Sequence, residues 1–350
     1  MEVIQIQDKK KWNDKINSFE KWDVYYLNEY AKSLQIHGDG EPNLIYYEKD
    51  GKKMAYVMMK RDIAEYKPLT PYIEKEKYFD WTTPYGYGGP LYSGELSEQW
   101  VAEFYSELNE YCKRQNIVTQ FFRFHPLLQN QKKIEKYCDV AYIKKTVYVD
   151  TTNEEVIFRN MTPNNRNMVR KAKKNGIEII QDKGERLEEF QKIYFATMQN
   201  NQAESYYYFE KEYFEYLLQE MKDNMIFFYA LYDGKPISAS IFFYNERYMH
   251  YHLSGTLPEC RKMAATNLLL SEAASWAAGH GIKQLHLGGG VGVEDSLLSF
   301  KKHFNRNGLI DFCIGRNIFL PDEYEELVKK REENDSDFDR NRPFMIKYRG

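Results

Sequence analysis

Residues 286–304 read HLGGGVGVEDSLLSFKKHF, an apolar start followed by three consecutive glycines and then by a run with helical periodicity. Asp295 or Ser296 is placed to cap that helix, and the glycines allow a tight turn between a strand and the helix. The segment is not a Walker loop, because Gly292 is followed by Val293 instead of the lysine that reaches phosphate. It also lacks the GxGxxG spacing of a dinucleotide site. We therefore predict a strand–turn–helix unit whose open backbone is suited to line a ligand site.

One lysine of this helix lies among apolar residues. At about 100° per residue, Leu298, Phe300 and Phe304 form an apolar arc around Leu297, and Lys301 falls inside that arc. A lysine on a packed face snorkels to solvent, pairs with an anion or lines a cleft. In the last case it faces a phosphate, a carboxylate or a developing oxyanion. The pattern leaves these alternatives open.

Composition limits the class of protein. The chain has 350 residues, a net charge of −3 and 29% charged residues, which predicts two domains and excludes binding of nucleic acid over the whole surface. It has neither a long uncharged apolar window nor a signal pattern, so we expect no transmembrane helix. The four cysteines lack CxxC spacing, which argues against a zinc or disulfide framework and favours a cytoplasmic location.

Two similar halves follow each other along the chain. Asp50-Gly51 and Asp233-Gly234 each predict a hairpin between strand-like runs. In both halves a further helix-like run then leads into an apolar strand, at 98–126 and at 265–290. We interpret the halves as two copies of one α/β unit.

The predicted domains are residues 1–150 and 151–316. The tail, 317–350, begins as a helix and either packs back on the first domain or frays. At the start of the second domain, NNRNMVRKAKKNG (164–176) predicts a basic helix that Gly176 ends.

The order of elements in the second half resembles the GNAT acyltransferase fold. Two such units in tandem, with LHLGGG followed by DSLLSFKKHF, resemble the Fem-type aminoacyltransferases of peptidoglycan cross-bridge synthesis and related N-acyltransferases. TPYGYGGPLY (83–92), FFRFHPL (121–127) and YFATMQNNQAESYYYF (194–209) carry the resemblance further. It implies an α/β fold with mixed sheets, built as two tandem GNAT-like domains with a cleft between them.

The resemblance also implies roles for matching residues. The pair Phe300-Lys301 matches the family pair whose lysine lies beside the acyl-transfer site. Arg166, Arg170 and Lys171 match its basic helix and are expected to hold phosphates of a nucleotide-linked precursor or of a tRNA 3′ end. Arg166 and Arg170 share one helix face at i, i+4. A solvated basic face is the alternative.

Further candidates have plain structural alternatives. Tyrosine clusters are common as packing, and glycine-rich turns often serve only the backbone. His250 and His252 alternate on a strand, but no third ligand is visible, so we predict no metal site. The remaining candidates for substrate binding are Tyr85, Tyr87, Glu204, Tyr206, Tyr207, His286, Gly288, Gly289 and Gly290.

Two departures concern the donor. At the place of the acyl-CoA pyrophosphate loop the chain reads RKMAAT (261–266), without glycine. Phe300 stands where many GNAT proteins have a tyrosine that protonates the leaving thiolate, and the long helical arm of some Fem members is absent.

We therefore expect aminoacyl transfer from aminoacyl-tRNA to a primary amine of a nucleotide- or lipid-linked cell-envelope precursor, with no tightly bound cofactor. The first alternative is an N-acyltransferase that uses acetyl-CoA or another acyl-CoA and acts on an amino sugar or other small amine. The second is a non-catalytic module that binds tRNA or glycan. Peripheral contact with a membrane stays open, and the sequence predicts no oligomeric state.

Overall fold

The computed structural model describes residues 1–290, 292 and 295–350. The chain divides into two compact units, Met1–Ile143 with Phe312–Gly350, and Lys144–Asp311. We expected boundaries after residues 150 and 316, several residues later than the observed divisions after Ile143 and Asp311. The reason is strand pairing, because residues 146–150 pair inside the second unit and residues 314–318 pair inside the first.

The first unit contains a mixed sheet in the order β1-β2-β3-β4-β6-β13, with β5 paired to β3. Only β4 and β6 run parallel; the other described neighbours are antiparallel. Its strands are β1 (Glu2–Gln5), β2 (Glu41–Lys49), β3 (Lys52–Asp62), β4 (Phe79–Thr82), β5 (Leu91–Ser93), β6 (Ile117–Arg123) and most of β13 (Leu309–Ile318). Its helices are α1 (Lys9–Asn17), α2 (Asn28–His37), α3 (Glu98–Arg114) and α10 (Pro321–Asn334).

The tail belongs to the first unit. Helix α10 places Leu327 and Val328 in a buried cluster with Val118 of β6 and with Tyr348, near the end of the chain. Asp80 of β4 is buried beneath this tail and forms ion pairs with Arg61 and Arg349.

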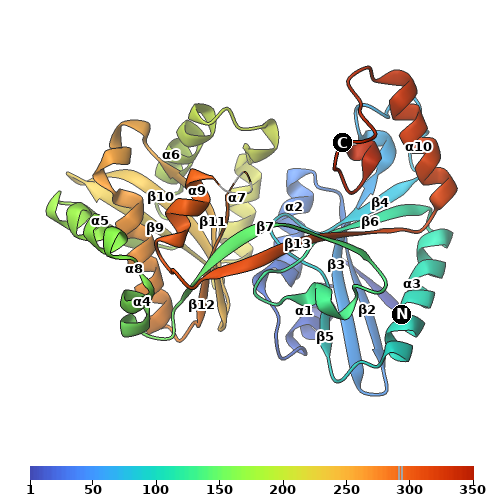
Figure 1. Cartoon of the computed structure of the whole chain (residues 1–350), viewed down its shortest axis with the longest axis horizontal. Coiled ribbons are helices and arrows are strands. Elements are labelled where there is room, and N and C mark those ends of the chain that lie inside the picture. The colour runs from blue at the N-terminus through green and yellow to red at the C-terminus, as the bar shows by residue number, and fades with distance from the viewer. Residues whose placement is uncertain (291, 293–294) are drawn as a thin grey trace. The chain divides into compact units, whose positions relative to one another are not determined.

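The second unit contains a mixed sheet in the order β7-β12-β11-β10-β9-β8, in which only β11 and β12 run parallel. Its strands are β7 (Asp139–Asp150, from residue 144), β8 (Glu178–Asp182), β9 (Met225–Tyr232), β10 (Lys235–Tyr244), β11 (Tyr248–Thr256) and β12 (Gln284–Gly289). Its helices are α4 (Glu154–Asn160), α5 (Pro163–Lys174), α6 (Leu187–Asn200), α7 (Lys211–Glu220), α8 (Ala265–Gly279) and α9 (Ser296–Lys302) (Figure 1).

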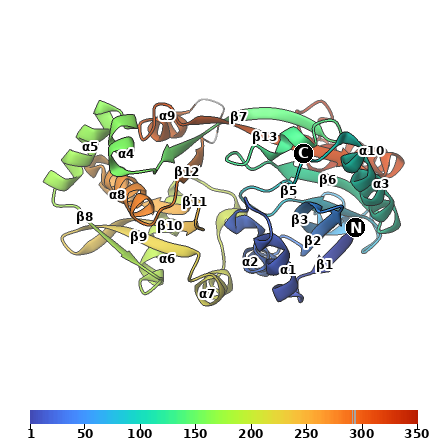
Figure 2. The ribbon, with the colours of Figure 1, turned by 90° about the horizontal axis from the view of Figure 1, so that it is seen from below.

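Helices cover both faces of the second sheet. Figure 2 shows α4, α5 and α8 on one face and α6 and α7 on the other. Helix α8 is apolar on nearly all sides, as a helix enclosed by other elements must be. Its Ala273 and Ala277 are buried in one cluster with Ala172 of α5, and these short side chains let the two helices approach closely.

Both predicted hairpins are present. Asp50 and Gly51 join β2 to β3, and Asp233 and Gly234 join β9 to β10; all four residues have positive φ. Two successive positive φ values are the geometry of a type I′ turn, which Asp-Gly favours because glycine has no Cβ. In each unit the hairpin is followed by a strand, a helix and a strand parallel to the previous one, so the predicted internal repeat is confirmed.

Candidate functional site

The parallel pair β11 and β12 is hydrogen-bonded over a short length only. Pairing covers Tyr248 to His250 on β11 and stops at His286 on β12. Beyond that point β11 carries one extra residue, His252, against β10. On its other side β12 carries an extra residue, Leu287, against β7. Such bulges bend a strand and redirect its side chains, so the end of β12 leaves the regular ladder.

The glycines at the end of β12 have specific tasks. Gly288 has a φ of +73°, which favours glycine. A Cβ on Gly290 would lie 2.0 Å from Oδ1 of Asp295, so no larger residue fits without displacing that carboxylate. The Asp295 carboxylate accepts hydrogen bonds from the backbone N–H groups of Leu298 and Gly292, both at 2.8 Å. The expected cap is thus confirmed, and an acidic side chain occupies the position where a phosphate loop would hold its anion.

Helix α9 buries Lys301. Its side chain is 7% exposed, and Nζ donates a hydrogen bond of 2.7 Å to the carbonyl oxygen of Gly289. Lys301 forms no ion pair with a carboxylate among the described residues. The helical-wheel prediction is confirmed for Lys301, Leu298 and Phe304, which are buried, and wrong for Leu297, which is 39% exposed at the first turn. Snorkelling does not fit so buried a side chain.

Burial lowers the pKa of Lys301 from its usual 10.5 to about 8, because the charged form is poorly solvated. The nearby carboxylate of Asp295 acts in the opposite direction, and the ammonium of Lys144 lowers the pKa further. Nζ also lies 5.9 Å from the centre of the Tyr251 ring. The side chain is therefore a desolvated ammonium that a developing negative charge would stabilise.

Tyr251 was not predicted as a site residue. Its hydroxyl is hydrogen-bonded to Ser254, and burial raises its pKa, although the hydroxyls of Ser254 and Ser240 act against that rise. The bulge at His252 puts Tyr251 and Ser254 on one side of β11, where a regular strand would separate them. No sequence pattern marks that bulge.

Further hydroxyls gather at the start of α8. Ser238 of β10, Thr256 of β11 and Thr266 of α8 are linked by hydrogen bonds. Ala264, just before α8, has a φ of +61°, a conformation that costs a non-glycine residue roughly 1 kcal/mol. The segment Pro258–Met263 is a 3-10 turn. The glycine-free segment thus forms a turn before a helix, but methyl groups lie beside its amides where a pyrophosphate loop has glycine.

Phe300 and His286 contact other side chains of the second unit, and their expected roles in catalysis and substrate binding stay predictions. Phe300 is half-buried, and its ring meets Phe304 edge-on at 5.3 Å. His286 is buried, and its Nε2 lies 3.0 Å from the hydroxyl of Thr146 on β7. Burial, followed by the proximity of His250, lowers the pKa of His252 to about 3, so His252 is neutral at physiological pH.

The basic helix α5 is tied to α4. Arg166 donates hydrogen bonds to the carbonyl oxygens of Phe158 and Met161, and its guanidinium lies 4.8 Å from the centre of the Phe158 ring. Arg170 and Lys171 are exposed, and Arg170 bonds to Asn167. In the described part of the chain, no hydrogen bond or ion pair joins the three basic residues to Lys301.

The tyrosine segment after α6 packs on itself. Tyr194 donates a hydrogen bond to the carbonyl oxygen of Tyr207, and the ring of Tyr206 meets those of Tyr207 and Phe209. Glu204 is exposed. This arrangement accords with the packing alternative for the tyrosines and leaves the acceptor role as a prediction.

In the first unit, the loop with Tyr85 and Tyr87 lies beside β6. Arg123 bonds to the carbonyl oxygen of Gly86, and the Tyr85 carbonyl accepts from Tyr30. Tyr87 is half-buried, and burial raises its pKa to about 12, opposed by the charge of Arg123.

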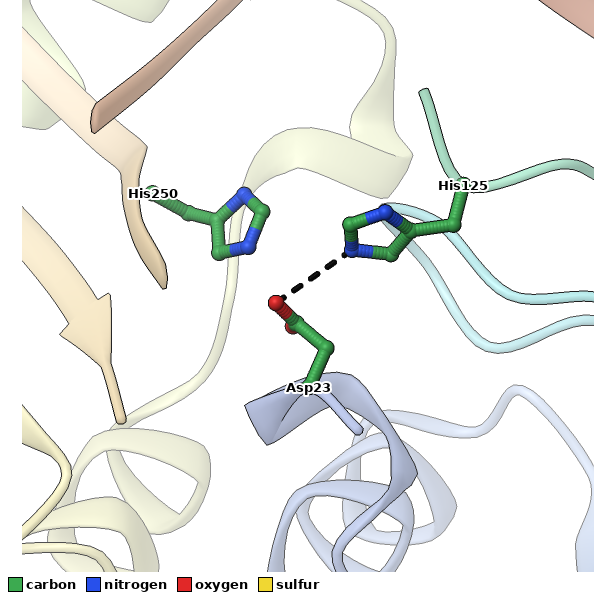
Figure 3. Close-up of side chains that lie close together, drawn as sticks. All are labelled: Asp23, His125 and His250. Atoms are coloured by element: carbon green, nitrogen blue, oxygen red, sulfur yellow. Dashed lines mark ion pairs between the residues drawn. The ribbon is translucent and has the colours of Figure 1, made fainter. Parts of the chain in front are cut away.

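The ring of Tyr87 lies 5.9 Å from that of His125. His125 in turn forms a buried ion pair of 3.3 Å with Asp23 (Figure 3). No local pattern predicts that pair, because 102 positions separate His125 from Asp23.

The chain is similar to one protein domain family and to several proteins of known structure. Residues 159–301 match the acetyltransferase (GNAT) domain family. The solved structure of FemX matches with a TM-score of 0.67 and 13% identity, over 93% of this chain and 99% of that one. The solved structure of L-PGS from Bacillus licheniformis matches with a TM-score of 0.55 and 11% identity, over 90% of this chain and 93% of that one. The solved structure of a tandem GNAT protein from the clavulanic acid biosynthesis pathway matches with a TM-score of 0.50 and 8% identity, over 91% of this chain and 99% of that one. None of the curated proteins matched the sequence.

These matches confirm the predicted fold and the resemblance to Fem-like tandem-GNAT proteins. The match to the acetyltransferase (GNAT) domain lies within the second unit and ends at Lys301. Within the described residues, no helix is long and apolar enough to cross a membrane.

Proposed function

We propose that the protein transfers an aminoacyl group from aminoacyl-tRNA to a primary amine of a nucleotide- or lipid-linked cell-envelope precursor. The observation that carries this proposal is the buried ammonium of Lys301 at the glycine end of β12, inside a GNAT acyltransferase domain. The fold shared with FemX and with the C-terminal domain of a protein from Agrobacterium fabrum named "Putative Lysylphosphatidylglycerol Synthetase" supports an aminoacyl donor, since the latter name denotes transfer of an amino acid to a lipid.

The chemistry needs a neutral amine and a stabilised oxyanion. As the new C–N bond forms, the ester carbonyl oxygen becomes negative, and the C–O bond to the tRNA ribose then breaks. The Lys301 ammonium uses one N–H on Gly289, and no other hydrogen bond of that group occurs among the described residues. Two N–H groups therefore remain for the oxyanion or for the leaving ribose oxygen. When Lys301 gives a proton to the leaving ribose oxygen, the lysine becomes neutral. The attacking amine carries a surplus proton once the C–N bond has formed, and this proton restores the Lys301 ammonium.

An acyl-CoA donor is the second candidate, because residues 159–301 match an acetyltransferase domain family. The turn before α8 argues against it, since Ala264 and its neighbours place methyl groups where pyrophosphate-binding loops have glycine. The same Lys301 ammonium would then serve a thioester, and the leaving group would be a thiolate.

The test is a transfer assay read by mass spectrometry, in which aminoacyl-tRNA and acetyl-CoA are each offered with a panel of nucleotide- and lipid-linked amines. Aminoacyl transfer that is lost in Lys301→Met and kept in Lys302→Met supports the proposal, because Lys302 is exposed on the same helix. Acetyl transfer alone favours the second candidate. Transfer that proceeds undiminished in Lys301→Met contradicts the proposed role of the lysine.

A further inference from the structure

A second lysine reaches the same glycines from another strand. Lys144 lies at the start of the β7 segment in the second unit, and its Nζ donates a hydrogen bond to the carbonyl oxygen of Gly290. Lys301 donates to the neighbouring carbonyl, that of Gly289. A Cβ on Gly289 would lie 3.6 Å from Cε of Lys144, so the Lys144 side chain crosses directly over this glycine. Two ammonium groups thus hold consecutive carbonyl oxygens of one turn.

Among residues 1–290, 292 and 295–350, three charged or titratable groups lie near the Lys301 ammonium. Asp295 faces it from the start of α9, Lys144 from β7, and the Tyr251 ring from β11. The Asp295 carboxylate accepts hydrogen bonds from the N–H groups of Gly292 and Leu298. Lys302, the next residue of α9, is exposed. Lys144 is therefore the cation that acts on Lys301 from outside its own helix.

We propose that Lys144 is a positioning residue of the transfer site, which holds the carbonyl oxygen of Gly290 beside that of Gly289 and places a second positive charge near the Lys301 ammonium. Two like charges on one turn each favour loss of a proton from the other. An ammonium that gives up its proton more readily donates more effectively to an oxyanion or a leaving oxygen. The catalytic part of this inference rests on the proposed function, whereas the coupling between the two lysines does not.

The neighbouring Lys145 provides a matched control. It has the same side chain and lies on the same strand, and its ammonium forms an ion pair with Asp311. Because successive residues of a strand point to opposite faces, its charge is directed away from that of Lys144. Lys144→Met removes the charge and keeps the length of the side chain, and Lys144→Arg restores the charge.

The first measurement needs no substrate. The Lys301 ammonium is titrated by NMR of lysines labelled at Cε, and its signal is assigned by its loss in Lys301→Arg. We expect Lys144→Met to raise the pKa of Lys301 by roughly half a unit to one unit, and Lys144→Arg to restore it. Lys145→Met should leave it unchanged. An unchanged pKa in Lys144→Met, or an equal rise in Lys145→Met, overturns the inference.

The second measurement follows transfer against pH. In Lys144→Met, the limb of the kcat/KM profile that reports Lys301 should move to higher pH by the same amount as in the NMR titration, and Lys144→Arg should return it. A coupling seen by NMR with no transfer in any variant would contradict the proposed function alone. A fall in rate with an unmoved profile would assign Lys144 a purely structural role and so overturn the inference.

Discussion

The ammonium of Lys301 is hydrogen-bonded to the carbonyl oxygen of Gly289 at 2.7 Å, and that carbonyl is its one hydrogen-bond acceptor among the described residues. A carbonyl dipole orients an ammonium but does not neutralise its charge. The nearby carboxylate of Asp295 accepts hydrogen bonds from two backbone N–H groups, and its charge acts on Lys301 against the effect of burial. Burial still lowers the pKa of Lys301, so this positive charge is poorly solvated, and negative charge that develops beside it during a reaction would stabilise it.

Removing this charge should abolish transfer without unfolding the protein. We expect Lys301→Met to reduce kcat/KM about 100-fold or more, the usual effect of losing one oxyanion donor. Lys301→Arg should retain part of the activity, because it keeps the charge but not the position of the donor. Steady-state kinetics of the three proteins, with circular dichroism to verify folding, make the comparison. Lys302→Met is the control, and a similar loss in that exposed neighbour would contradict a specific role for Lys301.

Lys301→Met should also stabilise the protein at neutral pH. The folded-state pKa of Lys301, about 8, lies below the unfolded value of 10.5, so the unfolded chain binds the proton more tightly. This costs about 3 kcal/mol of stability below pH 8, and the cost disappears as the pH rises from 8 to 10.5. Urea unfolding of Lys301→Met should show a higher free energy of unfolding than wild type at pH 7 and no advantage near pH 10.5. A pH-independent difference would contradict the shifted pKa.

The fold was predictable wherever local chemistry determines it. Asp-Gly between aromatic runs specifies a type I′ hairpin, and both hairpins are present. Asp295 before an apolar periodic run specifies a capped helix, and its carboxylate accepts from Leu298 as expected. The domain edges were less predictable, since β7 and β13 continue past each division and only pairing partners distant in sequence define where the units separate.

The candidate site was predictable for Lys301 and not for its surroundings. A lysine inside an apolar arc is visible on a helical wheel. The place of Tyr251 near Lys301 depends on the bulge at His252, and no periodic pattern in the sequence marks that bulge. Lys144 reaches Gly290 across 146 positions, and no local pattern encodes such a contact. The resemblance to the Fem-type family, not a local pattern, led us to expect Arg166 to hold a phosphate, and that role stays a prediction. In the structure its guanidinium binds carbonyl oxygens at the end of α4, which the sequence does not indicate.

Gly290→Ala should disturb the site through Asp295. The added methyl group would meet Oδ1 at 2.0 Å, and the cap of α9 would have to move. We expect a loss of about 1 kcal/mol in stability, the value of an N-cap, together with a fall in transfer as Lys301 shifts with its helix. Gly292→Ala is the matched control, because its methyl group would lie 3.9 Å from the same carboxylate, at ordinary contact distance. Equal effects of the two substitutions in urea unfolding and in transfer assays would refute this account.

The tail should contribute to stability through Asp80. Burial raises the pKa of this carboxyl, but Arg349 and then Arg61 outweigh burial, and the pKa lies below its usual value. The stabilisation is therefore present above about pH 4 and is lost as the pH falls through the folded-state pKa.

Arg349→Met leaves the buried carboxylate of Asp80 with one cationic partner, Arg61 at 2.8 Å, and with the hydrogen bond from the Tyr348 hydroxyl. It should cost about 3 kcal/mol at pH 7 and move the midpoint of acid unfolding to higher pH, because the pKa of Asp80 rises. Lys329→Met, which breaks an exposed pair with Glu333, should cost less than about 1 kcal/mol and leave the acid midpoint in place. An acid midpoint that stays at the wild-type pH in Arg349→Met would show that Asp80 does not depend on the tail for its charge.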